Sequence, residues 1–203
     1  FFGEGLPRDE DDKVIGKYRN PAKNGKYCLS YGGQFRTLAA TLGISEEEAK
    51  VSFDNFWDGA EPLRLLKERL TKHWRDNGEK GIYCKLTGCY LHSRSEHSLI
   101  NLLFQHTGAF IMDIAGMLMD RYLKEVGTFE YRQDGSHCYI VQGTEVRRLV
   151  YMHDEYLFEC DESVSELVAE LGVKSIVKAG EALKLNVPLD ADAKIGDTWG
   201  VVH

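Results

Sequence analysis

Apolar residues recur along the chain with two different spacings, one typical of helices and one typical of strands. Between residues 45 and 76 the spacing is three to four residues, and a capping-box pattern, Ser45 with Glu48, opens the first of two helices expected there. Pro62 suits the first turn of the second helix. Three other segments combine β-branched and aromatic residues with flanking turn signals and are predicted strands: residues 82–92, 138–142 and 147–160. This distribution predicts an α+β fold.

Two further predicted helices carry polar residues at regular spacing. The first is expected to begin at Asn20, a good N-cap, with Pro21 in its first turn, and to end at the Gly32-Gly33 pair. The second is expected to begin at a capping box from Ser93 to Glu96 and to continue through an apolar stretch to a break near Gly127. Helical geometry then decides which polar residues share a face.

On the first of these helices, Lys23, Tyr27 and Tyr31 recur every fourth residue and share a face, with Arg19 just ahead of them. A cationic end followed by an aromatic end suits a nucleotide, because phosphates favour basic side chains and the free amides of a helix N-terminus. An aromatic ring further along can stack on a base. The alternative is an ordinary amphipathic helix whose lysines extend into solvent.

On the second helix, the uncharged polar residues His97, Asn101 and Gln105 lie four residues apart. Such a stripe on a largely apolar helix suits hydrogen bonds to sugar edges, to base edges in a minor groove or to phosphate oxygens. The alternative is that all three are ordinary core or interface residues whose partners lie inside the protein.

The triplet His153-Asp154-Glu155 lies between two apolar runs, residues 149–152 and 156–158. Extended apolar runs on both sides predict two strands with the charged triplet at the tip of a hairpin. Carboxylates at that place would reach a metal ion instead of being buried. A plain surface turn is the alternative for the triplet taken alone.

Together these three motifs resemble the C-terminal part of family A DNA polymerases, the class of bacterial DNA polymerase I and of the replicative polymerases of podovirus-like phages. The fingers helix of that family has the pattern R-x3-K-x3-(F/Y)-x3-Y-G, which this chain matches with Arg19, Lys23, Tyr27, Tyr31 and Gly32. A later helix has (R/H)-x3-N-x3-Q and the palm hairpin has H-D-E, matched by the stripe from His97 and by the triplet from His153. The motifs occur in the family's order over residues 19–203, and the ending from Lys194 resembles the phage branch.

The resemblance implies a right-hand polymerase architecture. Helical fingers would occupy residues 1–80, and a partial palm, an antiparallel sheet with helices, would occupy residues 81–203. The implied activity is template-directed DNA synthesis with two Mg²⁺ ions, acting on a DNA primer-template and deoxynucleoside triphosphates. Asp154 would be a catalytic metal ligand, and Glu155 a secondary carboxylate near the metals.

The remaining site residues also take their roles from the resemblance. Arg19 and Lys23 would hold the triphosphate, with Lys23 also protonating the leaving pyrophosphate, and Tyr27 would flank the incoming sugar and base. His153 would contact the nucleotide at the primer end. Contacts to the template base and the minor groove would come from the other motif residues: Tyr31, Gly32, His97, Asn101 and Gln105.

One part of the family's metal site is missing from this chain. In the family a second aspartate belongs to an earlier palm strand, with a D-x-S-x-x-E motif that precedes the fingers helix. The literal match at residues 161–166 comes after the hairpin and is explained locally, because Asp161 is a good N-cap for a helix from about Ser163 to Lys178. The thumb and the first palm strand are therefore expected in an upstream half, without which this chain is expected to be inactive.

Composition agrees with a piece of a larger enzyme. The 203 residues are 43% hydrophobic, enough for a core, and a net charge of −7 is unlike that of a free-standing duplex-DNA binder. Five cysteines without a C-x-x-C pair indicate a reducing compartment, so we expect the cytoplasm, or the host cytoplasm for a phage protein. No membrane partner is expected, because the longest apolar helix carries polar and charged residues.

Two other functions stay open on the sequence. The first alternative is a non-catalytic DNA-binding module descended from a polymerase. The second is an unrelated metal phosphohydrolase in which His153 and Asp154 are adjacent ligands. In the first case the motifs would be kept for binding alone. The second case needs further His or Asp ligands at helix spacing, and the sequence shows none.

Overall fold

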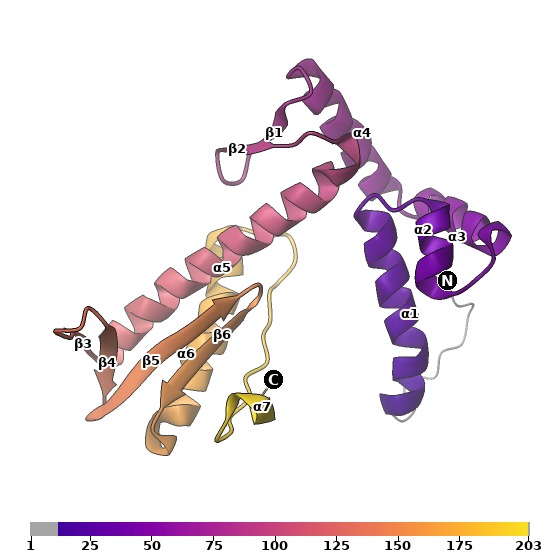
Figure 1. Cartoon of the computed structure of the whole chain (residues 1–203). Helices are drawn as coiled ribbons and strands as arrows, with labels where there is room; N and C mark the ends of the chain where they lie inside the picture. Colours follow the sequence, from indigo (N-terminus) through magenta and orange to yellow (C-terminus); the bar gives the residue numbers. More distant parts are fainter. Residues whose placement is uncertain (1–11, 203) are drawn as a thin grey trace. The chain divides into compact units, whose positions relative to one another are not determined.

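A computed structural model describes residues 12–202 of the chain (Figure 1). The chain forms two compact units, the first extending to Gln105 and the second beginning at His106. This division differs from the fingers-to-palm junction expected near residue 80, because the first two strands belong to the unit that holds the N-terminal helices. The roles of residues 1–80 as fingers and 81–203 as palm stay predictions.

Helices make up most of the described part of the first unit: α1 (Asp12–Ser30), α2 (Phe35–Leu42), α3 (Glu46–Gly59) and α4 (Glu61–Asp76). The capping box predicted for α3 is confirmed. The Ser45 hydroxyl accepts from the Glu48 amide at 3.2 Å, and the Glu48 carboxylate accepts from the Ser45 amide at 3.1 Å. Pro62 lies in the first turn of α4, also as predicted. Local capping patterns therefore locate both helix starts.

The start predicted for α1 at Asn20 is wrong. The helix begins at Asp12, so Pro21 lies inside it and not in its first turn. An internal proline removes one main-chain hydrogen bond and crowds the preceding turn, at a cost of about 3 kcal/mol, yet α1 continues through it. Arg19 and Lys23 consequently lie along the helix, where the free amides of a helix N-terminus are not available to a phosphate beside them.

The strands β1 (Gly81–Cys84) and β2 (Cys89–His92) form an antiparallel hairpin in the first unit. The indole N–H of Trp74 on α4 donates to the Ser93 carbonyl at 2.9 Å and so ties α4 to the end of this hairpin. A second buried cluster around Leu29 packs the end of α1 on α2 and α3. The C-terminal end of α1 is thereby fixed within the unit. The main core of the unit comprises Trp57, Leu70, Trp74, Ile82, Cys84, Leu91, Leu99 and Ile100.

A 3₁₀ turn, η1 (Glu96–Ser98), leads into the long helix α5 (Leu99–Val126). The capping box predicted to begin at Ser93 is wrong. Ser95 is the cap, and its hydroxyl accepts from the backbone amide two residues later at 3.3 Å. Ser93 is buried instead, and its hydroxyl donates to the Ser95 carbonyl at 2.9 Å. The break predicted near Gly127 is confirmed, since a strand begins there.

By length and composition alone, the stretch Glu96–Val126 is apolar enough to cross a membrane. Part of this stretch is covered within the fold. Met119 and Leu123, toward the C-terminal end of α5, are fully buried in the core of the second unit, against strands of its sheet. Of its apolar window, 22% is buried.

The second unit contains an antiparallel sheet in the order β3-β4-β5-β6. Its strands are β3 (Gly127–Tyr131), β4 (His137–Val141), β5 (Thr144–Met152) and β6 (Glu155–Cys160). The strands predicted over 138–142 and 147–160 are confirmed, although β5 begins earlier, at Thr144. β3 escapes prediction because it follows α5 directly, without the turn signal that normally marks a strand.

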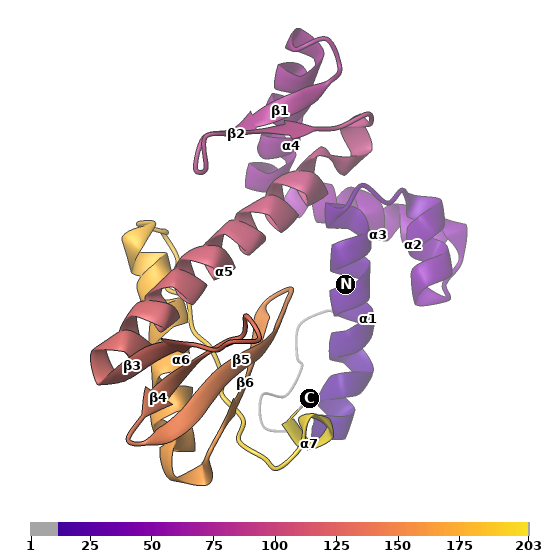
Figure 2. The same cartoon turned by 60° about the vertical axis from the view of Figure 1, so that its left-hand side comes forward.

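One face of this sheet is covered by α5 and α6 (Glu162–Ala182), whose buried residues Val164 and Val168 join the core (Figure 2). Asp161 caps α6, because its carboxylate accepts from the Ser163 amide at 3.0 Å. The D-x-S-x-x-E match at residues 161–166 is thus a helix cap, as predicted. A short helix, α7 (Trp199–Val202), ends the described part of the chain.

Candidate functional site

The predicted stripe of α1 forms a continuous surface. The rings of Tyr27 and Tyr31 stack with centroids 5.7 Å apart and an interplanar angle of 11°. Lys23 Nζ lies 5.7 Å from the centroid of the Tyr27 ring, and Arg19 is exposed one turn earlier. The two tyrosines are 45% and 38% exposed, so both rings keep a surface for stacking. The shared face predicted from the four-residue spacing is confirmed.

The end of α1 packs against the start of the second polar stripe. Gly32 has a φ of 88°, and a Cβ atom at this position would clash with the carbonyl oxygen of His97. Only glycine tolerates both the left-handed backbone and so close an approach. The first unit therefore places the Tyr31-Gly32 motif beside His97, although the two are far apart in the sequence.

The three polar residues of the second stripe differ in exposure. His97 and Gln105 are exposed, whereas Asn101 is partly buried. The side-chain oxygen of Asn101 is fully buried and has no hydrogen-bond partner among the described residues. A buried oxygen left unpaired costs about 1–3 kcal/mol unless a donor from water or a ligand reaches it. For the Asn101 oxygen, the described residues supply no partner inside the protein.

The predicted hairpin is formed by β5 and β6, with His153 and Asp154 as its two-residue turn. Glu155 pairs with Met152 and is the first residue of β6, not part of the turn. His153 has a φ of 56°, which is uncommon for a residue other than glycine and strains the backbone at this turn. Both turn residues are exposed, so the predicted place at the hairpin tip is confirmed for His153 and Asp154.

Two tyrosines outside the predicted motifs fasten this hairpin to α5. Tyr151 and Tyr156 face each other across the strands with ring centroids 5.1 Å apart. The Tyr151 hydroxyl donates to the Ala109 carbonyl at 3.2 Å, and the Tyr156 hydroxyl donates to the Met112 carbonyl. Their only signal in the sequence is one aromatic residue on each side of the turn region, which is ordinary strand composition.

The surroundings of these two tyrosines keep both hydroxyls protonated. Burial raises the pKa of Tyr156 to about 12; neighbouring Tyr151 adds to this rise and Arg148 opposes it. Burial also raises the pKa of Tyr151, and the Asp113 carboxylate adds to that rise. Both side chains are therefore hydrogen-bond donors throughout the neutral pH range.

The carboxylates at the hairpin tip suit Mg²⁺ in type but not in number. Asp154 and Glu155 offer the hard oxygen ligands that Mg²⁺ prefers. The described residues contain no group of three or more His, Cys, Asp or Glu side chains that could hold a metal ion. The described residues therefore form no complete Mg²⁺ site by themselves.

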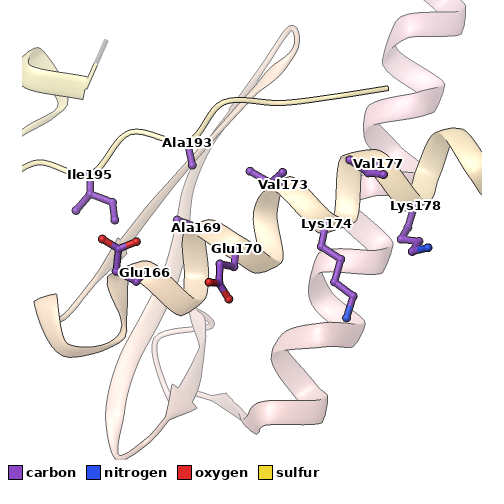
Figure 3. A pocket seen from close by; sticks show the side chains of 9 residues that line it. All are labelled: Glu166, Ala169, Glu170, Val173, Lys174, Val177, Lys178, Ala193 and Ile195. Carbon is purple, nitrogen blue, oxygen red and sulfur yellow. The ribbon is translucent and has the colours of Figure 1, made fainter. Parts of the chain in front are cut away.

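A groove of about 640 Å³ runs along α6, and none of the predicted site residues lines it (Figure 3). Glu166 and Glu170 lie toward one end and Lys174 and Lys178 toward the other, with small apolar side chains between them. The segment that contains Ala193 and Ile195 forms its other wall. The residues that line the groove therefore all lie outside the three predicted motifs.

The predicted site residues fall into two sets, one in each unit. In the first unit, contacts join the aromatic end of the α1 stripe to η1; in the second, they fasten the hairpin tip to α5. The roles assigned to these residues stay predictions. The first set is Arg19, Lys23, Tyr27, Tyr31, Gly32, His97, Asn101 and Gln105, and the second is His153, Asp154 and Glu155.

Comparison with known sequences matches nearly the whole chain. A model of the family described as DNA polymerase family A matches residues 6–201. DNA polymerase I of Aquifex aeolicus (strain VF5) is 26% identical over 197 residues, which cover 94% of this chain and 31% of that protein. The DNA-directed DNA polymerase of Escherichia phage T7 is 24% identical over 197 residues, which cover 91% of this chain and 27% of that protein.

Comparison with solved structures gives the same fold. The POL domain of Pol1 from M. smegmatis, in complex with DNA primer-template and dNTP, matches with a TM-score of 0.64 at 24% identity. The match covers 83% of this chain and 28% of that one. The α+β fold of helices with an antiparallel sheet is confirmed. This chain spans less than a third of the length of each of these three proteins.

Proposed function

This chain belongs to DNA polymerase family A, and on that premise we propose that it supplies the fingers and most of the palm of a DNA-directed DNA polymerase. The thumb and the first palm strand would come from an upstream half. We call this chain together with that half the completed polymerase. Its reaction would be template-directed nucleotidyl transfer from deoxynucleoside triphosphates to a DNA primer-template. The process would be DNA replication. The resemblance of the ending from Lys194 to the phage branch points to phage DNA.

The hairpin tip is the observation that carries this proposal. Asp154 is exposed in a two-residue turn, and Glu155 follows it as the first residue of β6. In the family, an H-D-E hairpin in the palm presents the catalytic carboxylates. His153, in its strained backbone conformation, would contact the nucleotide at the primer end.

The stripe of α1 would bind the incoming nucleotide. Arg19 and Lys23 would hold the triphosphate through charge-assisted hydrogen bonds. Lys23 would also donate a proton to the pyrophosphate as it leaves, which is general acid catalysis. Tyr27, whose exposed ring lies between Lys23 and Tyr31, would flank the sugar and the base.

The second stripe would contact the template and the minor groove. Gly32 lies against His97. Together with Tyr31, these residues would meet the template base and its neighbouring pair. Asn101 is partly buried, and its side chain, turned outward, would offer an acceptor oxygen to the N2 amino group of guanine, the base-edge donor of a minor groove. Gln105, one turn further along α5, would extend these contacts.

Mg²⁺, when bound, would stabilise the negative charge that develops during transfer. Asp154 and Glu155 would be the ligands from this chain, and a second aspartate from the upstream half would complete the site. The enzyme would work in the cytoplasm, or in the host cytoplasm for a phage protein. This expectation rests on the sequence, which has five cysteines without a C-x-x-C pair.

A non-catalytic DNA-binding module is the second candidate. The incomplete set of metal ligands in the described residues favours it, since binding DNA needs no metal. The two candidates differ in one respect that can be measured. A module would bind a primer-template but would use no nucleotide in the presence of any upstream half.

Replacing Lys23 by alanine in the completed polymerase should lower kcat/KM for the nucleotide by about 10- to 100-fold, the worth of one or two charge-assisted hydrogen bonds. Affinity for the primer-template should change little, because the partner of Lys23 is the triphosphate and not the duplex. Single-nucleotide incorporation kinetics and binding of a labelled primer-template measure the two effects.

Lys50 provides the control, since it is exposed on α3 and belongs to none of the predicted motifs. Lys50→Ala should leave both quantities unchanged. Asn101→Ala should show the opposite bias and alter extension from matched and mismatched primer ends to different extents, because a minor-groove contact senses the geometry of the pair. Equal losses of nucleotide and DNA affinity in Lys23→Ala would favour an ordinary basic helix.

Replacing Tyr27 by phenylalanine in the completed polymerase should strongly raise discrimination against dideoxynucleotides. The family has Phe or Tyr at this position, near the sugar of the incoming nucleotide. The phenolic hydroxyl supplies a hydrogen bond that a missing 3′ hydroxyl would otherwise make, while the ring keeps its stacking surface. The measurement is the ratio of kcat/KM for deoxy and dideoxy substrates.

Tyr31→Phe removes the same hydroxyl one helical turn later and should leave that ratio unchanged. The two rings stack on each other, so both variants lose a tyrosine hydroxyl from the same surface. A difference between them therefore reports where the hydroxyl lies, and not merely that one was removed. If Tyr27→Phe also left the ratio unchanged, Tyr27 would not face the sugar, and the roles of Arg19 and Lys23 would have to be withdrawn with it.

A further inference from the structure

The tip of the β5–β6 hairpin depends on two hydroxyl groups. Tyr151 on β5 pairs with Tyr156 on β6, and one further pair, Met152 with Glu155, separates them from the turn. Their hydroxyls donate to the carbonyls of Ala109 and Met112, which lie within one turn of each other on α5. Carbonyl oxygens in the middle of a helix have a second lone pair available, so these bonds do not break the helix. They hold both strands immediately next to Asp154.

A β-bulge aims Tyr151 at α5. The pairing register shifts between Arg148 and Val150, so β5 has one residue more than β6 over this stretch. Without the shift, strict alternation from Arg148 would place Tyr151 on the opposite face of the sheet from Tyr156. The bulge brings both tyrosines to the face that α5 covers. Bulges that re-aim a single side chain are frequent next to active sites.

α5 has a glycine, Gly116, where the β5–β6 hairpin packs against it. A Cβ atom at Gly116 would lie 2.9 Å from the Tyr156 hydroxyl and 3.2 Å from Arg148 Nη1, so any side chain there would displace both groups. The Arg148 guanidinium lies 5.8 Å from the centroid of the Tyr156 ring and 3.7 Å from an Asp120 oxygen. A glycine weakens the interior of a helix, and the close approach of Tyr156 accounts for this one.

We propose that Tyr151 and Tyr156 are positioning residues whose hydroxyl groups fix the hairpin tip and thereby the carboxylate of Asp154. This inference rests on the proposed function, in which Asp154 is a metal ligand. The tip needs such support because β6 is an edge strand of the described sheet, with a neighbouring strand on one side only. Reacting groups must be held to about 0.5 Å, and a displacement of about 1 Å costs about 100-fold in rate.

The test removes the hydroxyls and keeps the rings. In the completed polymerase, Tyr151→Phe combined with Tyr156→Phe should lower kcat by about 10- to 100-fold. The KM for the nucleotide and the affinity for the primer-template should stay unchanged, because neither tyrosine touches a substrate. A role in packing alone predicts an unchanged kcat, since phenylalanine preserves the ring contacts.

A second measurement needs only the 203-residue chain. Amide hydrogen exchange over residues 152–155 should become about tenfold faster in the double variant, because the two hydrogen bonds that restrain the tip are lost. Tyr139→Phe is the matched control. Tyr139 is buried in the same sheet, and its pKa is raised by burial and by its contact with Asp120, so the change also removes a hydroxyl interaction. It should lower the melting temperature without changing kcat or exchange at the tip.

The outcomes separate the inference from the proposed function. An unchanged kcat in the double variant, combined with an inactive Asp154→Ala, would overturn the positioning role and leave the proposed function standing. An equal fall of kcat in Tyr139→Phe would indicate general destabilisation and would also overturn it. An active Asp154→Ala would overturn the proposed function, and unchanged exchange over residues 152–155 would then show that the tyrosines do not hold the tip.

Discussion

Replacing Asp154 by alanine in the completed polymerase should abolish primer extension, with kcat/KM falling by more than about a thousandfold. In the proposed site this carboxylate would hold Mg²⁺, and the ion would supply electrostatic stabilisation of the charge that develops at the transferred phosphate. Electrostatic stabilisation of this kind is usually the largest single term in catalysis. Steady-state primer extension measures the loss, and circular dichroism with thermal unfolding measures whether the fold survives.

The fold should survive, because Asp154 is exposed in a two-residue turn. Asp154→Asn keeps the size of the side chain and removes its charge, and it should be as inactive as the alanine variant. Asp134 gives a matched control in another turn of the same unit, where its carboxylate accepts from the Ser136 amide at 2.9 Å. Asp134→Ala should change stability little and leave activity intact, because its carboxylate is exposed. Full activity in Asp154→Ala would contradict the metal-ligand assignment.

Features that depend on local spacing are the ones that the sequence predicts correctly. The stacked rings of Tyr27 and Tyr31 follow from a four-residue helical spacing, and the cap at Ser45 follows from its partner three residues later. The hairpin at Asp154 follows from apolar runs on both sides. In each case the information lies within a few residues, so long-range packing does not need to be known.

Two element boundaries show where local rules fail. Pro21 suits a helix start, and only the folded chain shows that α1 continues from Asp12 through it. The strand from Gly127 is stabilised by pairing with β4, in which Gly127 faces Val141. The two strands are joined only by residues 132–136, but β3 follows α5 directly and has no turn signal before it.

Contacts between distant segments decide the parts of the site that the sequence cannot predict. Gly32 is recognisable as a helix stop, but its contact with His97 depends on the packing of η1 against the end of α1. The unpaired oxygen of Asn101 follows from burial and not from spacing. Tyr151 reaches α5 only because a bulge shifts its register, and one residue of shift reverses the face of every side chain after it.

The 203-residue chain alone should not extend a primer. Its described residues contain no group of three or more metal-ligating side chains, and the single aspartate of the hairpin turn cannot position two Mg²⁺ ions. Affinity for a primer-template is also expected to be weak, because the net charge is −7 and the proposal assigns the DNA contacts of the thumb to the upstream half. Adding the upstream half should restore both the second aspartate and the missing DNA contacts.

Primer extension measured for the chain alone, for the upstream half alone and for the two together therefore tests the central claim most directly. The account predicts Mg²⁺-dependent extension only in the mixture, and its loss when the mixture contains Asp154→Ala. Robust Mg²⁺-dependent extension by the purified chain alone, or an inactive mixture in which the two halves demonstrably associate, would contradict it.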